Sequence, residues 1–477
     1  MDWRGYVILA IGIVVPLGLL LQRRERELFA WVCITVGVNI FDARVGLNFA
    51  AARLSGLMIL PFLPLGAFEF ERLLATRPMR FLLAGLGYLA LLGVIYGFVY
   101  PWPNEGYLRP FVQTSPGRVL VYGIRLLADL GIALFVARRV MRGTRPDEVL
   151  RLVLVGTTIA VIGGLLEFVT RIQIYEMLTG FPINEIPGRV RGLNFEPRGL
   201  GLTMVQGGFV AFLWSRHRRS SAAMALAVAH FMVLVLAVSA SALATAAFGW
   251  LCLLIFDRNA RRPLLAFAAA AAVAVVLVLL IGKDLPIAVS WVTNLSERFT
   301  IRQAVGIATR TPIEILARFL DIFDYTAVMA LASHPLELLI GFGPGLVMLP
   351  GSKFIPTDPR WSWVVTTNEG ITSPPTMGIL LEWSNGGIPM MLLWLAFVIA
   401  STRALSAMAE IDPEHGDSWR LGRGAFIAMA STYLIQASPI SAMWPIFIGL
   451  ALGAAALAHR PVPSWTRAPA VAIEGVR

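Results

Sequence analysis

The residues best suited to chemistry are three arginines that surround one carboxylate in a short polar segment. They are Arg189, Arg191, Arg198 and Glu196. A guanidinium group binds phosphate oxygens through two parallel N–H donors, a geometry that lysine cannot reproduce. Pro197 follows Glu196 and suits the first position of a helix, where free backbone N–H groups also attract anions. The segment predicts a phosphate site; a salt bridge within the loop is the structural alternative.

The elements around this segment are apolar helices. Hydrophobic residues make up 57% of the 477 positions and charged residues only 14%, against roughly a quarter in soluble domains. Apolar blocks recur near the length of about 20 residues that crosses a bilayer. We therefore expect an all-α, polytopic membrane protein with about 13 (12–14) transmembrane helices. The expected spans are 5–22, 28–42, 49–68, 79–100, 118–137, 150–170, 199–215, 222–238, 240–256, 263–282, 375–401, 422–436 and 438–457.

The net charge of +11 comes from short basic clusters between apolar blocks. Basic residues interleaved with aromatic ones would indicate nucleic acid, and this arrangement is absent, so we expect no nucleic-acid partner. Clusters between spans are typical of cytoplasmic loops. Placing them inside puts the N-terminus outside and the C-terminus inside. The clusters are Arg23–Arg26, Arg138–Arg145, Arg216–Arg219 and Arg258–Arg262.

This topology divides the chain into four parts. We expect an N-terminal transmembrane bundle over 1–282, with an outer loop at 171–198, and a large extracytoplasmic loop domain over 283–374. Transmembrane helices follow over 375–457, and a cytoplasmic tail over 458–477. Within the large loop, Thr311–Ala332 has apolar residues at three- and four-residue steps, which predicts an amphipathic helix.

Further candidates lie in the large loop, where cations are unusual on the outer side. Solvation of a loop domain is the alternative explanation for them. Those assigned to diphosphate or glycan binding, with Arg189 and Arg198, are Arg298, Arg318, His334, Lys353 and Arg360; Glu369 joins Arg191 and Glu196 as a catalytic candidate. Two further carboxylates, Glu167 and Glu382, fall within expected spans, and we interpret both as structural. We expect no metal and no cofactor.

Three segments, Arg191–Pro197, His334–Gly345 and Gly378–Pro389, together resemble motifs of the bacterial O-antigen polymerase and O-antigen ligase superfamily. The segment RGLNFEP, Arg191 to Pro197, is similar to the family's Arg-Gly-x-x-x-Glu-Pro motif before a span. His334–Gly345 resembles the family's Pro-Leu and Gly-x-Gly-x-Gly ending after an apolar helix, and Gly378–Pro389 resembles its Leu-x-Glu-x-Gly-Ile-x-Gly pattern. The resemblance covers most of residues 30–457 and implies a fold like that of C-type membrane glycosyltransferases.

Two departures favour a polymerase over a ligase. Ligases of this family have a His-Asn pair late in the large loop, where this chain reads Thr367-Asn368-Glu369. A Ser-Arg pair often opens a later span, and Ser239–Ala242 stands there instead.

The resemblance implies a glycosyltransferase of the bacterial inner membrane with its active site on the periplasmic side. It would polymerise undecaprenyl-diphosphate-linked repeat units for O-antigen, capsule or exopolysaccharide. Arg191 would stabilise the leaving diphosphate, helped by Arg198 and Arg318, while Glu196 or Glu369 would accept a proton. Implied partners are the lipid-linked donor, a glycan or lipid-linked acceptor, membrane lipid and a chain-length regulator. An O-antigen ligase and a transporter of lipid-linked oligosaccharide are the alternatives.

Overall fold

The computed structural model describes most of the chain, and every regular element in the described part is a helix. The described residues are 3–38, 51–62, 67–102, 114–180, 190–194, 197–237, 239–256, 265, 320, 322–355, 375–436 and 443–459.

The longer helices overlap most of the expected spans. They are α1 (Trp3–Leu21), α2 (Glu25–Thr35), α3 (Ala51–Phe62), α4 (Ala67–Ala75), α5 (Arg77–Val94), α6 (Ser115–Met141), α7 (Pro146–Thr170), α9 (Pro197–Arg218), α10 (Ser221–Leu236), α11 (Ala240–Phe256), α20 (Gly378–Ile411), α21 (Gly416–Ile435) and α22 (Met443–Ala458). The shorter helices are the π-helix η2 (Ile95–Val99), α8 (Ile174–Thr179), α15 (Ile322–Ser333), α16 (Pro335–Ile340), α17 (Met348–Gly351) and the 3₁₀ helices η6 (Ser352–Phe354) and η8 (Pro413–His415).

Among the described residues, four helices are long and apolar enough to cross a membrane. They are α5 with η2 (Arg77–Val99), α6, α7 and α20. Exposed apolar residues follow one face of α20 at Ile388, Leu392, Leu395 and Ile399. Apolar stripes of this extent on a protein surface mark contact with membrane or partner. Together with the composition, these helices identify the chain as a membrane protein.

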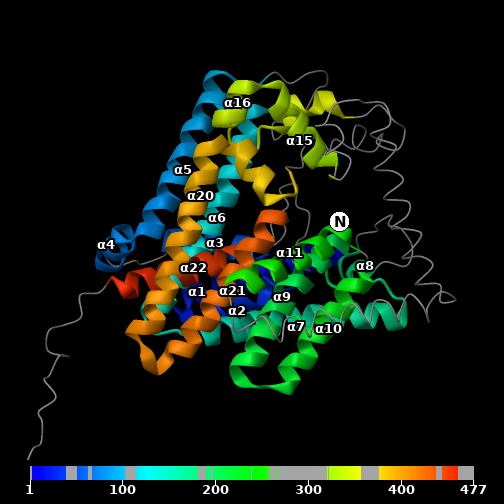
Figure 1. The fold of residues 1–477 in the computed structure, drawn as a ribbon. Helices are drawn as coiled ribbons and strands as arrows, with labels where there is room; N and C mark the ends of the chain where they lie inside the picture. Colours follow the sequence, from blue (N-terminus) through cyan, green and yellow to red (C-terminus); the bar gives the residue numbers. More distant parts are fainter. Residues whose placement is uncertain are drawn as a thin grey trace, which may run out of the picture.

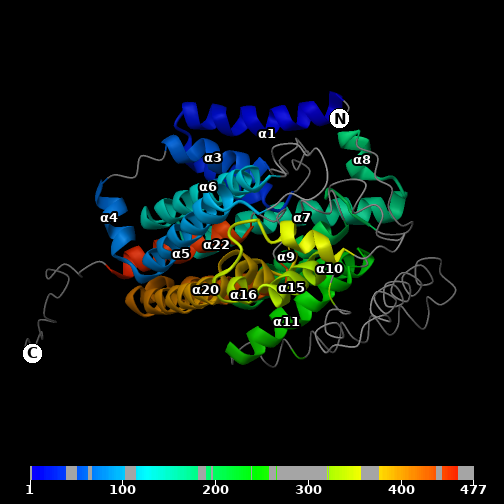
Figure 2. The ribbon, with the colours of Figure 1, turned by 90° about the horizontal axis from the view of Figure 1, so that it is seen from above.

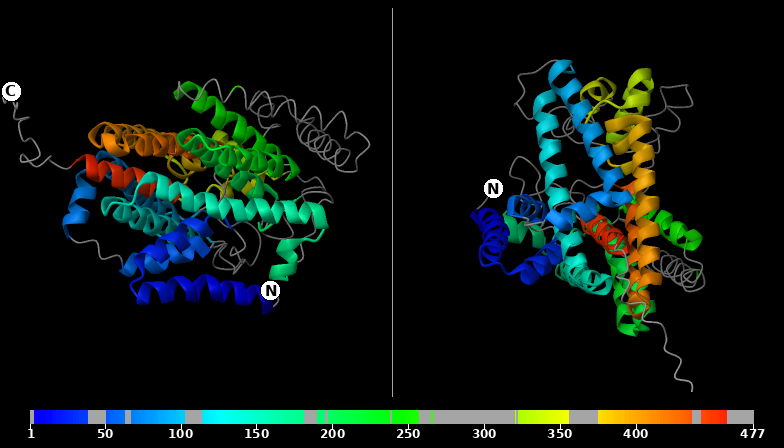
Figure 3. Two further views of the ribbon diagram at one scale, coloured as in Figure 1. Left: turned by 90° about the horizontal axis from the view of Figure 1, so that it is seen from below. Right: turned by 90° about the vertical axis from the view of Figure 1, so that its left-hand side faces the viewer.

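The helices lie in two directions. In Figure 1, α5, α6 and α20 run from top to bottom, and the right panel of Figure 3 shows the same three upright. By contrast, α1 and α7 run lengthwise across the view from above in Figure 2 and across the view from below in the left panel of Figure 3. The four candidate spans therefore do not share one axis. The thirteen-span topology stays a prediction, and so does the placement of a large outer loop.

Small residues bring the helices close together around α6. The backbone of α3 approaches α6 so closely that a methyl group on Gly56 would lie 2.1 Å from the carbonyl oxygen of Ala128. On α22, Gly449 and Gly453 form a G-x-x-x-G pair, and both face α6. Such pairs allow backbone-to-backbone packing of helices in membranes. Thus α6 packs directly against both α3 and α22.

Helix α20 is broken near its start. Gly386 and Gly387 are non-helical, Gly387 with φ of 59° and ψ of −153°, and Pro389 follows. The chain after α16 docks against the break: the N–H of Phe342 donates to the Ser384 carbonyl at 2.7 Å. The Gly-Gly-Ile-Pro sequence therefore forms a kink against which the chain after α16 packs closely.

A small cap of short helices, α15 to α17, covers one end of the upright group (Figure 1). Its own apolar core includes Leu331, Phe342 and Leu346, packed against Trp102 and Trp383. Of the expected amphipathic helix Thr311–Ala332, residues 322–332 are helical as part of α15; residues 311–319 and 321 lie outside the described part, and the amphipathic character stays a prediction.

Three of the four predicted basic clusters lie together. Glu25, inside the first cluster, pairs with Arg138 at 3.2 Å and Arg142 at 3.3 Å of the second. Arg218 of the third pairs with Asp147 at 3.0 Å, next to the second cluster. This arrangement is the one expected if these loops share a side of the membrane. The fourth cluster lies outside the described residues.

Two expected spans differ from the observed helices. Among the described residues the block 49–68 contains α3, which ends at Phe62, one residue after Pro61, and the start of α4 at Ala67. Proline cannot donate to the helical ladder and disfavours its continuation. The block 28–42 is represented by α2, which ends at Thr35, too short to cross a bilayer. The expected span 263–282 lies almost entirely outside the described residues.

Candidate functional site

A polar stripe runs along the inner face of α6. It consists of Arg118, Tyr122, Arg125 and Asp129. Steps of four, three and four residues place these side chains on one face of a helix. This face points into the upright group, where α5 and α20 also contribute walls. The stripe is the main polar surface that we find at the expected depth of a span.

Asp129 is held by an arginine from a neighbouring helix. Arg53 of α3 donates from Nε to Oδ1 of Asp129 at 2.8 Å and from Nη2 to Oδ2 at 3.2 Å. The Arg53 side chain is only 7% exposed, so its charge needs this partner. The two-donor geometry fixes the orientation of both groups.

A second carboxylate faces the stripe from the opposite wall. Glu382 of α20, which is 7% exposed, accepts a hydrogen bond at Oε1 from the Tyr433 hydroxyl of α21. Its other oxygen, Oε2, is buried and has no hydrogen-bond partner among the described residues. A buried polar atom without a partner is unusual in a folded protein and calls for an explanation, such as a site for a ligand.

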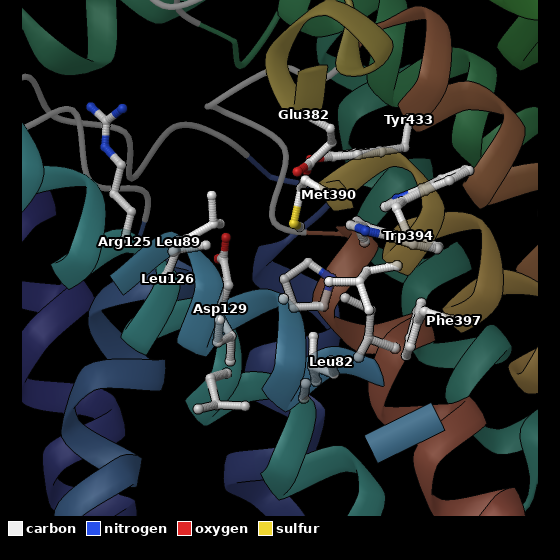
Figure 4. A pocket seen from close by; sticks show the side chains of 18 of the residues that line it. Leu82, Leu89, Arg125, Leu126, Asp129, Glu382, Met390, Trp394, Phe397 and Tyr433 are labelled. Atoms are coloured by element: carbon white, nitrogen blue, oxygen red, sulfur yellow. The ribbon is translucent and has the colours of Figure 1, made fainter. Parts of the chain in front are cut away.

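These groups line one cavity between α3, α5, α6, α20, α21 and α22. The cavity encloses about 180 Å³. Its other walls are apolar and aromatic, and Figure 4 shows Met390, Trp394 and Phe397 on the side of Glu382, opposite Arg125 and Asp129. Such a cavity suits a molecule with an apolar body and a small polar or charged group. We call it the α6 cavity.

The cap is connected to this cavity through hydrogen bonds. The side chain of Asn385, at the break in α20, donates to the Tyr122 hydroxyl at 2.7 Å and accepts from the Gly345 N–H at 2.9 Å. Arg118 donates to the Gly345 carbonyl at 3.5 Å. The polar stripe of α6 therefore extends from the cap into the cavity without a gap.

Arg191, the predicted catalytic arginine, lies elsewhere in an enclosed environment. Its side chain is 2% exposed, and its Nη2 donates to Oε1 of Gln173 at 2.7 Å and lies 3.5 Å from Oε2 of Glu176. The carboxylate of Glu167 accepts from the backbone N–H groups of Arg191 at 3.1 Å and Gly192 at 2.9 Å. These contacts fit a structural role for Glu167, as expected, and for Arg191 as well. The catalytic role of Arg191 stays a prediction.

Other predicted site residues have different surroundings. Arg198 lies in the first turn of α9, which begins at Pro197 as expected. His334 packs against Trp102 and Phe342, with ring centroids 5.5 and 5.4 Å apart, and its Nδ1 lies 2.8 Å from the Ala330 carbonyl oxygen. Lys353 is exposed on η6. None of these three lines the α6 cavity. Six predicted residues lie outside the described part: Arg189, Glu196, Arg298, Arg318, Arg360 and Glu369.

The sequence analysis did not single out Arg53, Arg125 or Asp129. All three fall inside expected spans, where ionisable residues are rare and usually functional. The sequence did contain one clue: Arg125 and Asp129 lie three and seven residues after Tyr122, a spacing that places all three side chains on one face of a helix. The arginine-rich loop drew attention instead because its charges are contiguous in sequence.

Known proteins do not identify the chain: no family model matches it, and neither does any curated protein. What the fold and cavity define is a class, an all-helical membrane protein with an amphipathic, arginine-lined cavity. Among the described residues, no cluster of His, Cys, Asp and Glu has the geometry of a metal site. Cys33 and Cys252 are single thiols within α2 and α11.

Proposed function

We propose that this protein is a membrane glycosyltransferase that uses a glycan linked to a polyprenyl diphosphate. The observation that carries the proposal is the α6 cavity, because it combines apolar walls with arginines and an unpartnered carboxylate oxygen. The order of motifs along the sequence supports the same activity. Polymerisation of repeat units is the form that the motifs favour, with a ligase as the alternative.

The lipid and the diphosphate of the donor need different surfaces, and the cavity provides both. The lipid needs an apolar surface, which Leu82, Leu86 and Leu89 of α5 and the aromatic residues of α20 provide. The diphosphate needs fixed donors. Arg125 lines the same wall as the Arg53–Asp129 pair, so a phosphate in the cavity would lie beside two guanidinium groups, one of them oriented by Asp129.

The reaction itself is a displacement at the anomeric carbon. The hydroxyl oxygen of the acceptor forms a bond to that carbon, and the bond from the carbon to the diphosphate oxygen breaks with its electron pair. Negative charge then grows on the diphosphate, where preorganised arginines stabilise it. The acceptor's proton passes to Oε2 of Glu382, which has no other partner among the described residues. In this scheme Tyr433 positions the carboxylate through Oε1.

The experiment is transfer by the purified protein in detergent, with a fluorescent polyprenyl-diphosphate oligosaccharide as donor. We expect a longer lipid-linked glycan and release of polyprenyl diphosphate in equal amounts. Glu382→Gln should slow transfer by about 10² to 10⁴-fold, the usual contribution of a general base, while the donor still binds. Wild-type protein that binds the donor and forms no glycosidic bond with lipid-linked or lipid A core acceptors would refute the proposal.

A transporter of lipid-linked oligosaccharide is a second candidate because α20 is broken. Discontinuous helices at membrane depth are common at transporter binding sites. The two candidates differ in covalent chemistry. A transporter moves the intact donor across a proteoliposome membrane, whereas the enzyme makes product in detergent, where there is no membrane to cross.

A further inference from the structure

A second, basic pocket lies at the end of the molecule where the three basic clusters meet. Four arginines and a tryptophan surround it: Arg26 of α2, Arg145 and Arg151 at the start of α7, and Arg218 and Trp214 of α9. It encloses about 250 Å³. We call it the basic pocket. It shares no residue with the α6 cavity.

The positive charge of this pocket is only partly neutralised. Two carboxylates, Asp147 and Glu148, also line it, so the four arginines leave two positive charges in excess. Asp147 is occupied: it pairs with Arg218 at 3.0 Å and accepts from the Ser418 hydroxyl at 3.0 Å. Within the described part of the chain, Arg26, Arg145 and Arg151 form no ion pair.

The arginines join directly onto an apolar stripe. Arg151 is exposed on α7, and Val155, Ile159 and Ile162 follow at steps of four, four and three residues. These three apolar side chains are 39 to 52% exposed, so one face of α7 is cationic at its start and apolar beyond. An anionic phospholipid has the matching pattern, with a phosphate next to acyl chains.

We infer that the basic pocket binds the phosphate of an anionic membrane phospholipid, whose acyl chains lie against this stripe of α7. Arg26, Arg145 and Arg151 donate to the phosphate oxygens. Trp214, with the Arg218 guanidinium 5.7 Å from its ring centroid, forms the opposite wall. The excess charge selects an anionic headgroup over a zwitterionic one, because a choline cation would be repelled.

The test is native mass spectrometry of the full-length protein in micelles, titrated with phosphatidylglycerol or with phosphatidylcholine. We expect one phosphatidylglycerol to bind well before phosphatidylcholine does. The double variant Arg145→Ala/Arg151→Ala should bind it roughly thirtyfold more weakly, since each arginine near a lipid surface contributes a factor of about five. The control is Arg403→Ala, which removes an exposed arginine of α20 outside the pocket and should bind like wild type.

Three results would overturn the inference. The first is equal affinity of wild type and double variant for phosphatidylglycerol. The second is equal affinity of wild type for the two lipids. The third is displacement of the lipid by millimolar inorganic phosphate, which would assign the pocket to a free phosphate. Should the alanine variant unfold, Arg145→Lys/Arg151→Lys keeps the charge and loses the paired donors, and it should bind with intermediate affinity. Glycan transfer is not measured here, so failure of this test is distinct from failure of the proposed function.

Discussion

Two arginine sites in this molecule differ in whether the guanidinium groups have room for a ligand. Around Arg191, Gln173, Glu176 and the neighbouring chain enclose the side chain almost completely. In the α6 cavity, Arg125 borders about 180 Å³ of space beside a carboxylate oxygen without a partner among the described residues. The comparison shows that the density of arginines in sequence does not tell whether a guanidinium group has room for a ligand. Arg191 has acceptors at Nη2, while its Nη1 is buried without a hydrogen-bond partner among the described residues. An arginine enclosed in this way stabilises the fold, whereas one beside a cavity can serve a substrate.

The largest expected effect is the loss of stability on removing the Arg191 side chain, which tests whether this arginine stabilises the fold. Arg191→Ala empties the space of the largest fully buried side chain and removes its contacts with the more exposed Gln173 and Glu176, and we expect a loss of about 3–5 kcal/mol in the free energy of unfolding. Thermal unfolding in detergent measures the change, with the exposed Arg403→Ala as a control that should alter stability by less than about 0.5 kcal/mol. A variant as stable as wild type that has lost transfer would return Arg191 to the active site.

A smaller loss of stability is expected at the break in α20. A methyl group added by Gly387→Ala would lie 2.1 Å from the Leu339 carbonyl oxygen, at a residue whose φ is 59°. Steric overlap and backbone strain together should cost about 2–4 kcal/mol. The matched control is Gly143→Ala, where φ is also positive, at 103°, but no atom lies within 4 Å of the new carbon. Equal losses in the two variants would show that the cap does not depend on close packing at the break.

The smallest expected loss of stability is at Asp129. This variant tests whether the Asp129 carboxylate only neutralises Arg53 or also takes part in binding a ligand in the cavity. Asp129→Asn keeps the shape of the side chain and removes the charge that neutralises Arg53. Since Asp129 is 26% exposed, we expect a loss of only about 1–3 kcal/mol in stability. Affinity for polyprenyl diphosphate, measured in a titration, should be retained or increased, because the cavity becomes more positive. A loss of affinity tenfold or greater would mean that Asp129 itself takes part in binding.

The helices were largely predictable from the sequence because apolar blocks of this length have few alternatives in a membrane protein. The helical blocks near 118–137 and 150–170 reappear as α6 and α7, and Pro197 opens α9 as expected. The directions of the helices were not predictable. Hydropathy reports the length and composition of a block, whereas the angle at which two helices cross depends on contacts such as that of Gly56 with Ala128.

The candidate site was less predictable than the fold. Arg53 and Asp129 are 76 residues apart, and only the packing of α3 on α6 brings them together. Glu382 was recognised as a carboxylate within a span, but its neighbour Tyr433 comes from another helix. Sequence alone could have raised one clue, the spacing of Tyr122, Arg125 and Asp129 on a single helical face.

The most direct test of the account is the affinity for polyprenyl diphosphate of three purified proteins: wild type, Arg125→Ala and Arg191→Lys. Each is measured below its own unfolding temperature and normalised to folded protein. The account predicts that Arg125→Ala binds at least about tenfold more weakly, the usual value of a lost charge-assisted contact, while Arg191→Lys binds like wild type although it is less stable. Unchanged affinity in Arg125→Ala together with lost affinity in Arg191→Lys would contradict it and place the diphosphate at the arginine-rich loop.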